Sequence, residues 1–193
     1  MSRATAPGGH PVGVFLVLTN TYANGIIYTE REREENIMKY IINFDMDGTI
    51  ADLYANPNWL EMLRAFNPTP YATAEPLWDM AELAEICAEL QKQGNIINII
   101  SWLSKESTAE YDREVRKAKK EWLARYKMPV DHFHGVKYGT PKAKVIKATI
   151  TADFEAILID DEEQNRNAWK IGRTVNPTTE NVIDFLKSLL ETC

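Results

Sequence analysis

Apolar residues in this chain follow two alternating patterns from about residue 38 onward. Short continuous apolar runs are typical of buried strands, and segments in which apolar residues recur every three or four positions are typical of helices. The segment 79–93 is the clearest helix, because it has the helical spacing and is followed by Gly94, a residue type that often ends helices. Its apolar positions are Met80, Leu83, Ala84, Cys87 and Leu90.

The predicted strands and helices alternate along the chain. Strands are predicted at 40–44, 95–101, 132–136, 154–159 and 173–175. Helices are predicted at 59–66, 79–93, 106–126, 140–148, 164–171 and 179–190, with Pro141 in the first turn of the fourth. The segment 67–76 contains several prolines and is predicted to be a loop. This alternation indicates an α/β domain with a mainly parallel central sheet and right-handed crossovers.

Residues 1–37 do not share this alternation. They begin with Gly, Pro, Ala and Thr residues and end in a run of Glu and Arg, whose purine-rich codons would resemble a bacterial ribosome-binding site. We therefore expect Met38, rather than Met1, to be the natural start and 1–37 to be a non-native extension without chemistry. The alternative is a poorly ordered N-terminal arm. We expect residues 38–193 to form a single domain.

Composition narrows the class of protein. The net charge of -6 argues against a protein that coats polyanions, although it allows a nucleotide substrate held by local cations. The two cysteines, Cys87 and Cys193, lie far apart and do not suggest a disulfide framework, so we expect a cytoplasmic protein. No apolar stretch reaches the roughly 20 residues of a membrane-spanning helix. The short apolar run at 12–18 is interrupted by Gly13 and makes a poor signal peptide.

The first predicted strand runs directly into two aspartates. Asp45 and Asp47 bracket Met46, so an extended backbone would point both carboxylates to one side. Gly48 then allows a sharp turn with little steric penalty. Two crowded carboxylates suit Mg²⁺, which prefers hard oxygen ligands, and they also suit nucleophilic and acid–base work divided between two side chains.

Polar residues also follow two other predicted strands. Ser101 ends the second strand of the chain, Asp160 and Asp161 follow the fourth, and Lys142 opens the helix between them. Because the carboxyl ends of parallel strands share one edge of a sheet, we expect these side chains to converge with the first pair of aspartates. Carboxylates, a hydroxyl and a cation in one place suit phosphoryl transfer, in which positioning and charge neutralisation provide most of the catalysis.

These four sites resemble, in order, the four motifs of the haloacid dehalogenase (HAD) superfamily of phosphatases. The segment 45–49, Asp-Met-Asp-Gly-Thr, is similar to the first motif, and Ser101, Lys142 and the acidic pair at 160–161 are similar to the next three. The resemblance covers about residues 38–190. It implies a Rossmann-like three-layer sandwich with a mainly parallel sheet and a minimal helical cap. The segments 45–52, 99–102 and 158–162 look most like the 5'(3')-deoxyribonucleotidase-like branch, including small bacterial and phage members.

The resemblance implies a role for each acidic residue. Asp45 would be the nucleophile that forms an aspartyl-phosphate, and Asp47 would be the general acid and then the general base. Asp45, the backbone carbonyl of Asp47 and Asp160 would coordinate Mg²⁺. Asp161 would orient these ligands, although the two aspartates of the pair could exchange roles. An Asp at position 47 is what the phosphatases of this superfamily have and its dehalogenases lack.

The remaining motif residues would bind the phosphate. Ser101, Gly48 and Thr49 would contact phosphoryl oxygens, and Lys142 would offset the charge of the phosphate. Lys144 is a rival for the lysine. We prefer Lys142 because the lysine of this superfamily precedes an apolar pair by three residues, as Lys142 precedes Val145 and Ile146.

Structural interpretations of the same residues stay open. Ser101 could be an ordinary strand-end hydroxyl, and Asp160-Asp161 a solvated turn. His132 and His134 lack a third soft ligand nearby and are expected to be strand or surface positions. The charges from 105 to 127 are expected to be mostly a solvated helix face. Several aromatic residues could stack on a base or belong to the core: Trp59, Tyr71, Trp78 and Trp102.

The segment between the first two motifs limits the substrate. Only residues 54–78 are available as a cap, which is too little to bury a large substrate. The site is therefore open to bulky phosphate esters or closed by a partner in a homo-oligomer. We expect a 5'-nucleotidase for (deoxy)ribonucleoside monophosphates, with another small phosphate ester or a nucleic-acid 5' or 3' phosphate end as the alternative substrate. A non-catalytic phosphate-binding protein would not be expected to keep both aspartates and the lysine.

Overall fold

The computed structural model of this chain describes residues 21–23, 26–28, 38–147 and 149–191. The chain divides into two units, Met1–Ile37 and Met38–Cys193. In the first unit, strands β1 (Thr21–Ala23) and β2 (Ile26–Tyr28) pair in antiparallel fashion. Most of the segment expected to be an extension lies outside the described residues.

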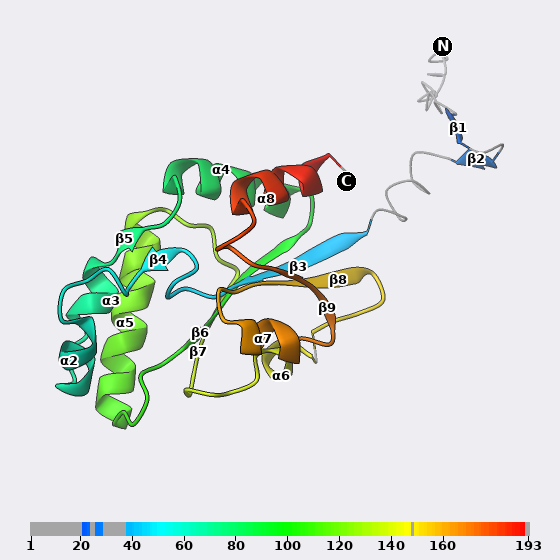
Figure 1. Cartoon of the computed structure of the whole chain (residues 1–193). Coiled ribbons are helices and arrows are strands. Elements are labelled where there is room, and N and C mark those ends of the chain that lie inside the picture. The colour runs from blue at the N-terminus through cyan, green and yellow to red at the C-terminus, as the bar shows by residue number, and fades with distance from the viewer. Residues whose placement is uncertain (1–20, 24–25, 29–37, 148, 192–193) are drawn as a thin grey trace, which may run out of the picture. The chain divides into compact units, whose positions relative to one another are not determined.

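The second unit is built on a five-stranded parallel sheet with the strand order β7-β6-β3-β8-β9 (Figure 1). This confirms the predicted α/β class and the parallel sheet. Its strands are β3 (Lys39–Phe44), β6 (Ile96–Trp102), β7 (His132–Val136), β8 (Phe154–Ile159) and β9 (Gly172–Val175). The predicted strands therefore agree with the observed ones to within a residue at each end.

Helices cover both faces of this sheet, which makes three layers (Figure 1). On one face, the buried residues Ile42 and Phe44 of β3 belong to a core with α4 (Met80–Lys92) and α8 (Val182–Leu190). On the other face, Ile41 belongs to a second core with α6 (Lys142–Ile146) and with Trp169, which follows α7 (Glu163–Ala168). The alternation of side chains along β3 thus divides the apolar core between two layers of helices.

The segment expected to form the cap has more structure than the sequence predicts. It holds α2 (Trp59–Arg64), α3 (Thr69–Thr73) and β5 (Glu75–Pro76). β5 pairs in antiparallel fashion with β4 (Ala51–Asp52), which lies just before the segment. The prediction of a loop at 67–76 was wrong. Pro70 lies in the first turn of α3, where its fixed φ suits a helix, and buried Tyr71 packs that helix against α5 (Ala109–Arg125).

Several predicted helix boundaries also differ from the structure: α2 ends at Arg64 instead of residue 66, and α5 and α8 begin at Ala109 and Val182 instead of residues 106 and 179. Pro141 is the N-cap residue of α6, so the helix begins at Lys142, two residues later than predicted, and it ends at Ile146. Residue 148, the predicted end, lies outside the described residues. α7 ends at Ala168 instead of residue 171, because Trp169 has an extended backbone and its buried side chain packs in the second core. Within the described part of the chain, none of the helices has both the length and the apolar composition needed to cross a membrane.

Candidate active site

The register of the sheet brings three strand ends together. Phe44, the last residue of β3, is paired with Ile99 of β6 and Ile159 of β8. Asp45 therefore leaves β3 beside the ends of both neighbours, and its backbone N–H donates to the carbonyl oxygen of Ile159 at 2.8 Å. The structure places Ser101 near the end of β6 and Asp160 directly after β8, so the expected convergence at this edge is observed.

The turn after Asp47 fits closely against the acidic pair. Gly48 has a φ of +78°, and a Cβ there would lie 2.5 Å from Oδ2 of Asp161 and 2.7 Å from the ring of Tyr54. The Thr49 hydroxyl donates to Oδ1 of Asp161 at 3.1 Å and accepts from the Asp161 N–H at 3.2 Å. Thr49, which we expected to bind phosphate, is thus engaged with Asp161 and ties the first motif to the fourth.

Lys142 lies between two of the carboxylates. Its Nζ is 2.6 Å from Oδ1 of Asp45 and 2.6 Å from Oδ2 of Asp160. Burial alone would lower the pKa of this lysine, but the two carboxylates outweigh it, so the pKa is raised and the charge is kept. Lys144, its rival in the sequence, is exposed on the same short helix.

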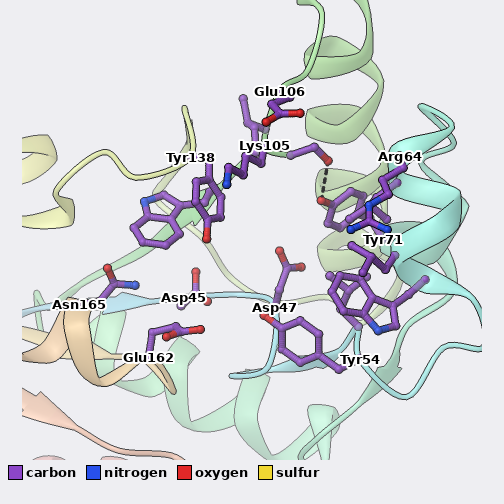
Figure 2. Close-up of a pocket in the computed structure, with 17 residues that line it drawn as sticks. Asp45, Asp47, Tyr54, Arg64, Tyr71, Lys105, Glu106, Tyr138, Glu162 and Asn165 are labelled. Carbon is purple, nitrogen blue, oxygen red and sulfur yellow. Dashed lines mark hydrogen bonds between the residues drawn. The ribbon is translucent and has the colours of Figure 1, made fainter.

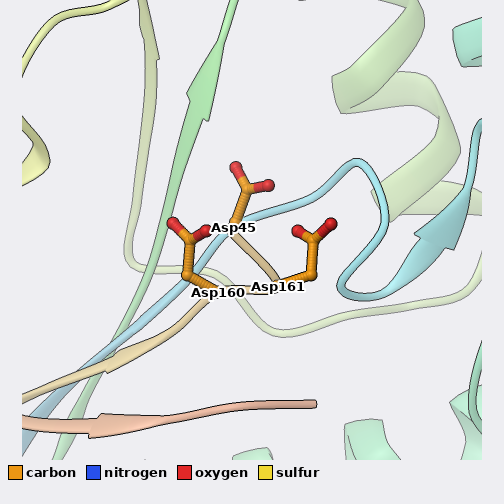
Figure 3. A group of neighbouring side chains, drawn as sticks. All are labelled: Asp45, Asp160 and Asp161. Carbon is orange, nitrogen blue, oxygen red and sulfur yellow. The ribbon is translucent and has the colours of Figure 1, made fainter. Parts of the chain in front are cut away.

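Asp45, Asp160 and Asp161 form a group that could hold a metal ion (Figure 3). One carboxylate oxygen from each lies within 4.8 Å of the others. Burial, followed by the charges of Asp45 and Asp160, raises the pKa of Asp161 to about 6. Burial and the Asp45 charge also raise the pKa of Asp160. These crowded carboxylates repel one another, and a bound cation would relieve that repulsion. Mg²⁺ prefers hard oxygen ligands, so these residues fit the ion.

Two residues that the sequence did not single out hold the acidic pair in place. The Asn165 amide donates to both oxygens of Asp160, at 3.2 and 3.1 Å. The Arg166 guanidinium donates to the carbonyl oxygens of Asp160 and Asp161, at 2.7 and 2.6 Å. Both residues lie on α7, the helix that directly follows the pair, so proximity in the sequence was the available signal.

The structure adds a second buried lysine to the site. Lys119 of α5 is fully buried and forms an ion pair with Oδ2 of Asp47, and its Nζ lies 2.7 Å from Oγ of Ser101. Burial raises the pKa of Asp47, and the Lys119 charge opposes that rise. The expectation of a mostly solvated face for the charges of this helix was therefore wrong at Lys119, because this position faces the site.

A cavity of about 520 Å³ opens beside Asp45 and Asp47 (Figure 2). Its walls carry aromatic rings, leucines, two cations, Arg64 and Lys105, and two further carboxylates, Glu106 and Glu162. The rings belong to Tyr54, Trp59, Tyr71, Trp102 and Tyr138. Three of the four aromatic residues named as stacking candidates thus line the cavity. Trp78 does not, and its indole N–H donates instead to the carbonyl oxygen of Thr49.

His132 and His134 lie away from this site, on β7 at the edge of the sheet. Their ring centroids are 6.1 Å apart. Neither belongs to the metal-competent group found among the described residues. The structure thus agrees with their interpretation as strand positions.

Among known proteins, similarity to this chain is found in the fold of solved structures and not in sequence. No family model and no curated protein matches the chain. One similar solved structure is a chain of the Pnkp1/Rnl/Hen1 RNA repair complex, with a TM-score of 0.50 and 14% identity over 83% of this chain. Our chain spans 46% of that chain. Another is a Mesorhizobium loti protein described as a HAD-like phosphatase, with a TM-score of 0.49, 13% identity and coverage of 80% of this chain and 87% of that one.

Proposed function

We propose that this protein is a Mg²⁺-dependent phosphomonoester hydrolase of the HAD type that works through an aspartyl-phosphate on Asp45. The observation that carries the proposal is the placement of Asp45. Its carboxylate is paired with Lys142 and grouped with two further aspartates, and both it and Asp47 line the cavity. A carboxylate held in this way is screened and fixed in orientation, as an attacking group must be.

The proposed reaction has two steps. In the first, a carboxylate oxygen of Asp45 bonds to phosphorus as the ester P–O bond breaks, and the leaving oxygen takes a proton from Asp47. In the second, water bonds to phosphorus and gives a proton back to Asp47, while the bond between phosphorus and Asp45 breaks and releases inorganic phosphate. Asp47 thus acts as acid and then as base, which requires it to remain beside the reacting oxygen throughout.

Mg²⁺ would be held by oxygens of Asp45, Asp160 and Asp161. We keep the carbonyl of Asp47 as a further candidate ligand. We include Asp161 because Asp160 already accepts hydrogen bonds from Lys142 and Asn165. The ion would supply positive charge where the attacking carboxylate and the phosphate repel each other.

Ser101 is suited to bind a phosphoryl oxygen. Its Oγ can accept the hydrogen bond from Lys119, which leaves its own proton free to be donated. Gly48 stands at the turn that presents Asp47 to the cavity. We propose these residues and Lys142 as the phosphate-binding set.

The cavity favours a substrate with a flat, partly apolar leaving group. Rings of Tyr54, Trp102 and Tyr138 provide stacking surfaces, and Arg64 and Lys105 provide positive charge. A nucleoside monophosphate fits this chemistry, so we propose nucleotidase activity as the first specific function. A phosphorylated end of a nucleic acid is the second candidate, since Tyr54 and Tyr138 are 46% and 55% exposed and the cavity is open to solvent beside them.

The test is hydrolysis of p-nitrophenyl phosphate with and without Mg²⁺, followed by a substrate panel. We expect activity that EDTA and Asp45→Asn both abolish. Wild-type activity that survives both treatments would overturn the mechanism. Nucleoside 5'- and 3'-monophosphates, sugar phosphates and phosphorylated oligonucleotides in the panel separate the candidate substrates.

A further inference from the structure

Lys119 is an unexpected residue on its face of α5. The buried residues around it on this helix include Val115, Ala118 and Trp122, which are apolar. A lysine that is 0% exposed is costly unless every part of its charge is compensated. A methionine would fill the same space without that cost, so the charge at this position calls for an explanation.

The surroundings of Lys119 satisfy its ammonium group completely. An ammonium has three N–H donors, and here the acceptors are Oδ2 of Asp47, Oγ of Ser101 at 2.7 Å and the carbonyl oxygen of Trp102 at 3.1 Å. The centroid of the Tyr71 ring lies 4.5 Å from Nζ of Lys119. The lysine is thus held by the end of β6, the turn after β3 and the cap segment.

We propose that Lys119 is a positioning residue that fixes which oxygen of Asp47 faces the substrate. The proposal rests on the proposed function and deepens it. Lys119 holds Oδ2, so Oδ1 is the oxygen that carries the proton to the leaving group. The same clamp sets the distance between Asp47 and Ser101, and therefore between the proton donor and the bound phosphoryl group.

The step that reports on this positioning is the first proton transfer, from Asp47 to the leaving oxygen. As the P–O bond breaks, its electron pair moves to the leaving oxygen, which takes the proton from Oδ1 of Asp47. The carboxylate that results keeps its ion pair with Lys119. Without the clamp, the carboxyl group can rotate, and a leaving group that depends on the proton departs more slowly than one that does not.

The experiment compares Lys119→Met with the wild type on phenyl phosphate and p-nitrophenyl phosphate in saturating Mg²⁺. The two substrates differ mainly in how much the leaving oxygen needs a proton. The readout is kcat/KM, which is limited to steps up to departure of the leaving group and does not include release of phosphate from Asp45. Lys117→Met is the matched control, because its side chain is 75% exposed on the same helix.

In Lys119→Met we expect kcat/KM on phenyl phosphate to fall at least about tenfold more than on p-nitrophenyl phosphate, a part of what a general acid contributes. The quantity compared is the ratio of kcat/KM on p-nitrophenyl phosphate to kcat/KM on phenyl phosphate, which should therefore rise in Lys119→Met. Asp47→Asn should also raise this ratio, and Lys117→Met should keep the wild-type ratio. Equal losses of Lys119→Met on the two substrates, or no loss, would overturn the proposal while leaving the phosphatase assignment intact. An inactive wild type would instead refute the proposed function.

A double variant keeps the test decisive if Lys119→Met folds poorly. Asp47→Asn removes the charge that Lys119→Met alone would leave buried and unpaired. In the Asp47→Asn background, Lys119→Met should cause no further change in the ratio, because the positioned group is already gone. A further rise of the ratio in the double variant would contradict the proposal.

Discussion

Nζ of Lys142 lies 2.6 Å from Oδ1 of Asp45, inside a site where a further carboxylate pairs with the same lysine. The lysine therefore offsets the repulsion among the aspartates before any metal or phosphate binds. This single contact joins the stability of the fold to the chemistry of the site, because Lys142 is almost completely buried.

Lys142→Met should impair both properties. Removing one partner of a buried ion pair leaves charge uncompensated, so the free energy of unfolding should fall by about 3–5 kcal/mol, and kcat should fall about a hundredfold or more. Denaturant unfolding and phosphatase assays measure the two effects. Lys144→Met, on the exposed face of the same helix, is the control and should resemble the wild type. The reverse order of severity would assign the phosphate lysine to Lys144.

The three aspartates that could bind Mg²⁺ should destabilise the protein when no metal is bound. Because Asp45, Asp160 and Asp161 repel one another, Asp161→Asn should raise the melting temperature of the metal-free protein. The same change should reduce the further rise that Mg²⁺ causes in the wild type. Thermal melts with EDTA and with a Mg²⁺ series test both signs, and Glu163→Gln on α7 is the control. An undiminished Mg²⁺ response in Asp161→Asn would remove this residue from the ligand set.

Gly48 offers a test of the close approach between the turn and the acidic pair. Gly48→Ala would place a methyl group 2.5 Å from Oδ2 of Asp161, in addition to the backbone strain at a φ of +78°. Gly139 has the same φ, and a Cβ there would meet nothing within 4 Å. We expect Gly139→Ala to cost only the strain of about 1–2 kcal/mol, and Gly48→Ala to cost more stability and most of the activity. Equal effects of the two substitutions would contradict the close contact.

The sequence located the strand ends because their signal is local. An apolar run followed at once by a polar residue specifies both a strand and its end, so Asp45, Ser101 and Asp160 could be placed on one edge before the structure was known. The parallel pairing of β3 with β6 and β8 then brought the three segments together.

Lys119 escaped prediction because the segment 105–127 is rich in charge throughout. Only its position around the helix axis distinguishes Lys119 from the other charged residues of this segment. Lys119 stands one position after Ala118 and three before Trp122, on the buried face. The helix α3 was missed for a related reason, since prolines signal a loop unless one occupies a first turn, as Pro70 does. In both cases tertiary packing outweighed the local composition.

His134 should make the protein less stable in mild acid. Burial and the neighbouring His132 lower the pKa of His134 below 6.5, so on acidification the unfolded chain takes up a proton before the folded chain does. The contribution of this residue to stability is therefore present above the unfolded pKa and is lost as the pH falls from there through the lower pKa of the folded state. We expect the free energy of unfolding of His134→Gln, measured in denaturant at about pH 7.5 and pH 5.5, to decrease less with acidification than that of the wild type. An identical decrease would show that His134 does not titrate differently in the two states.

The central claim is that Asp45 becomes covalently phosphorylated during turnover. Wild-type protein mixed with an excess of aryl phosphate and Mg²⁺ should be quenched in acid, digested and analysed by mass spectrometry. The account predicts one added phosphoryl group on the peptide that contains Asp45, labile to hydroxylamine as an acyl phosphate is, and absent from Asp45→Asn. Active wild-type protein with no phosphoryl group on that peptide, or with the group on another residue, would contradict it.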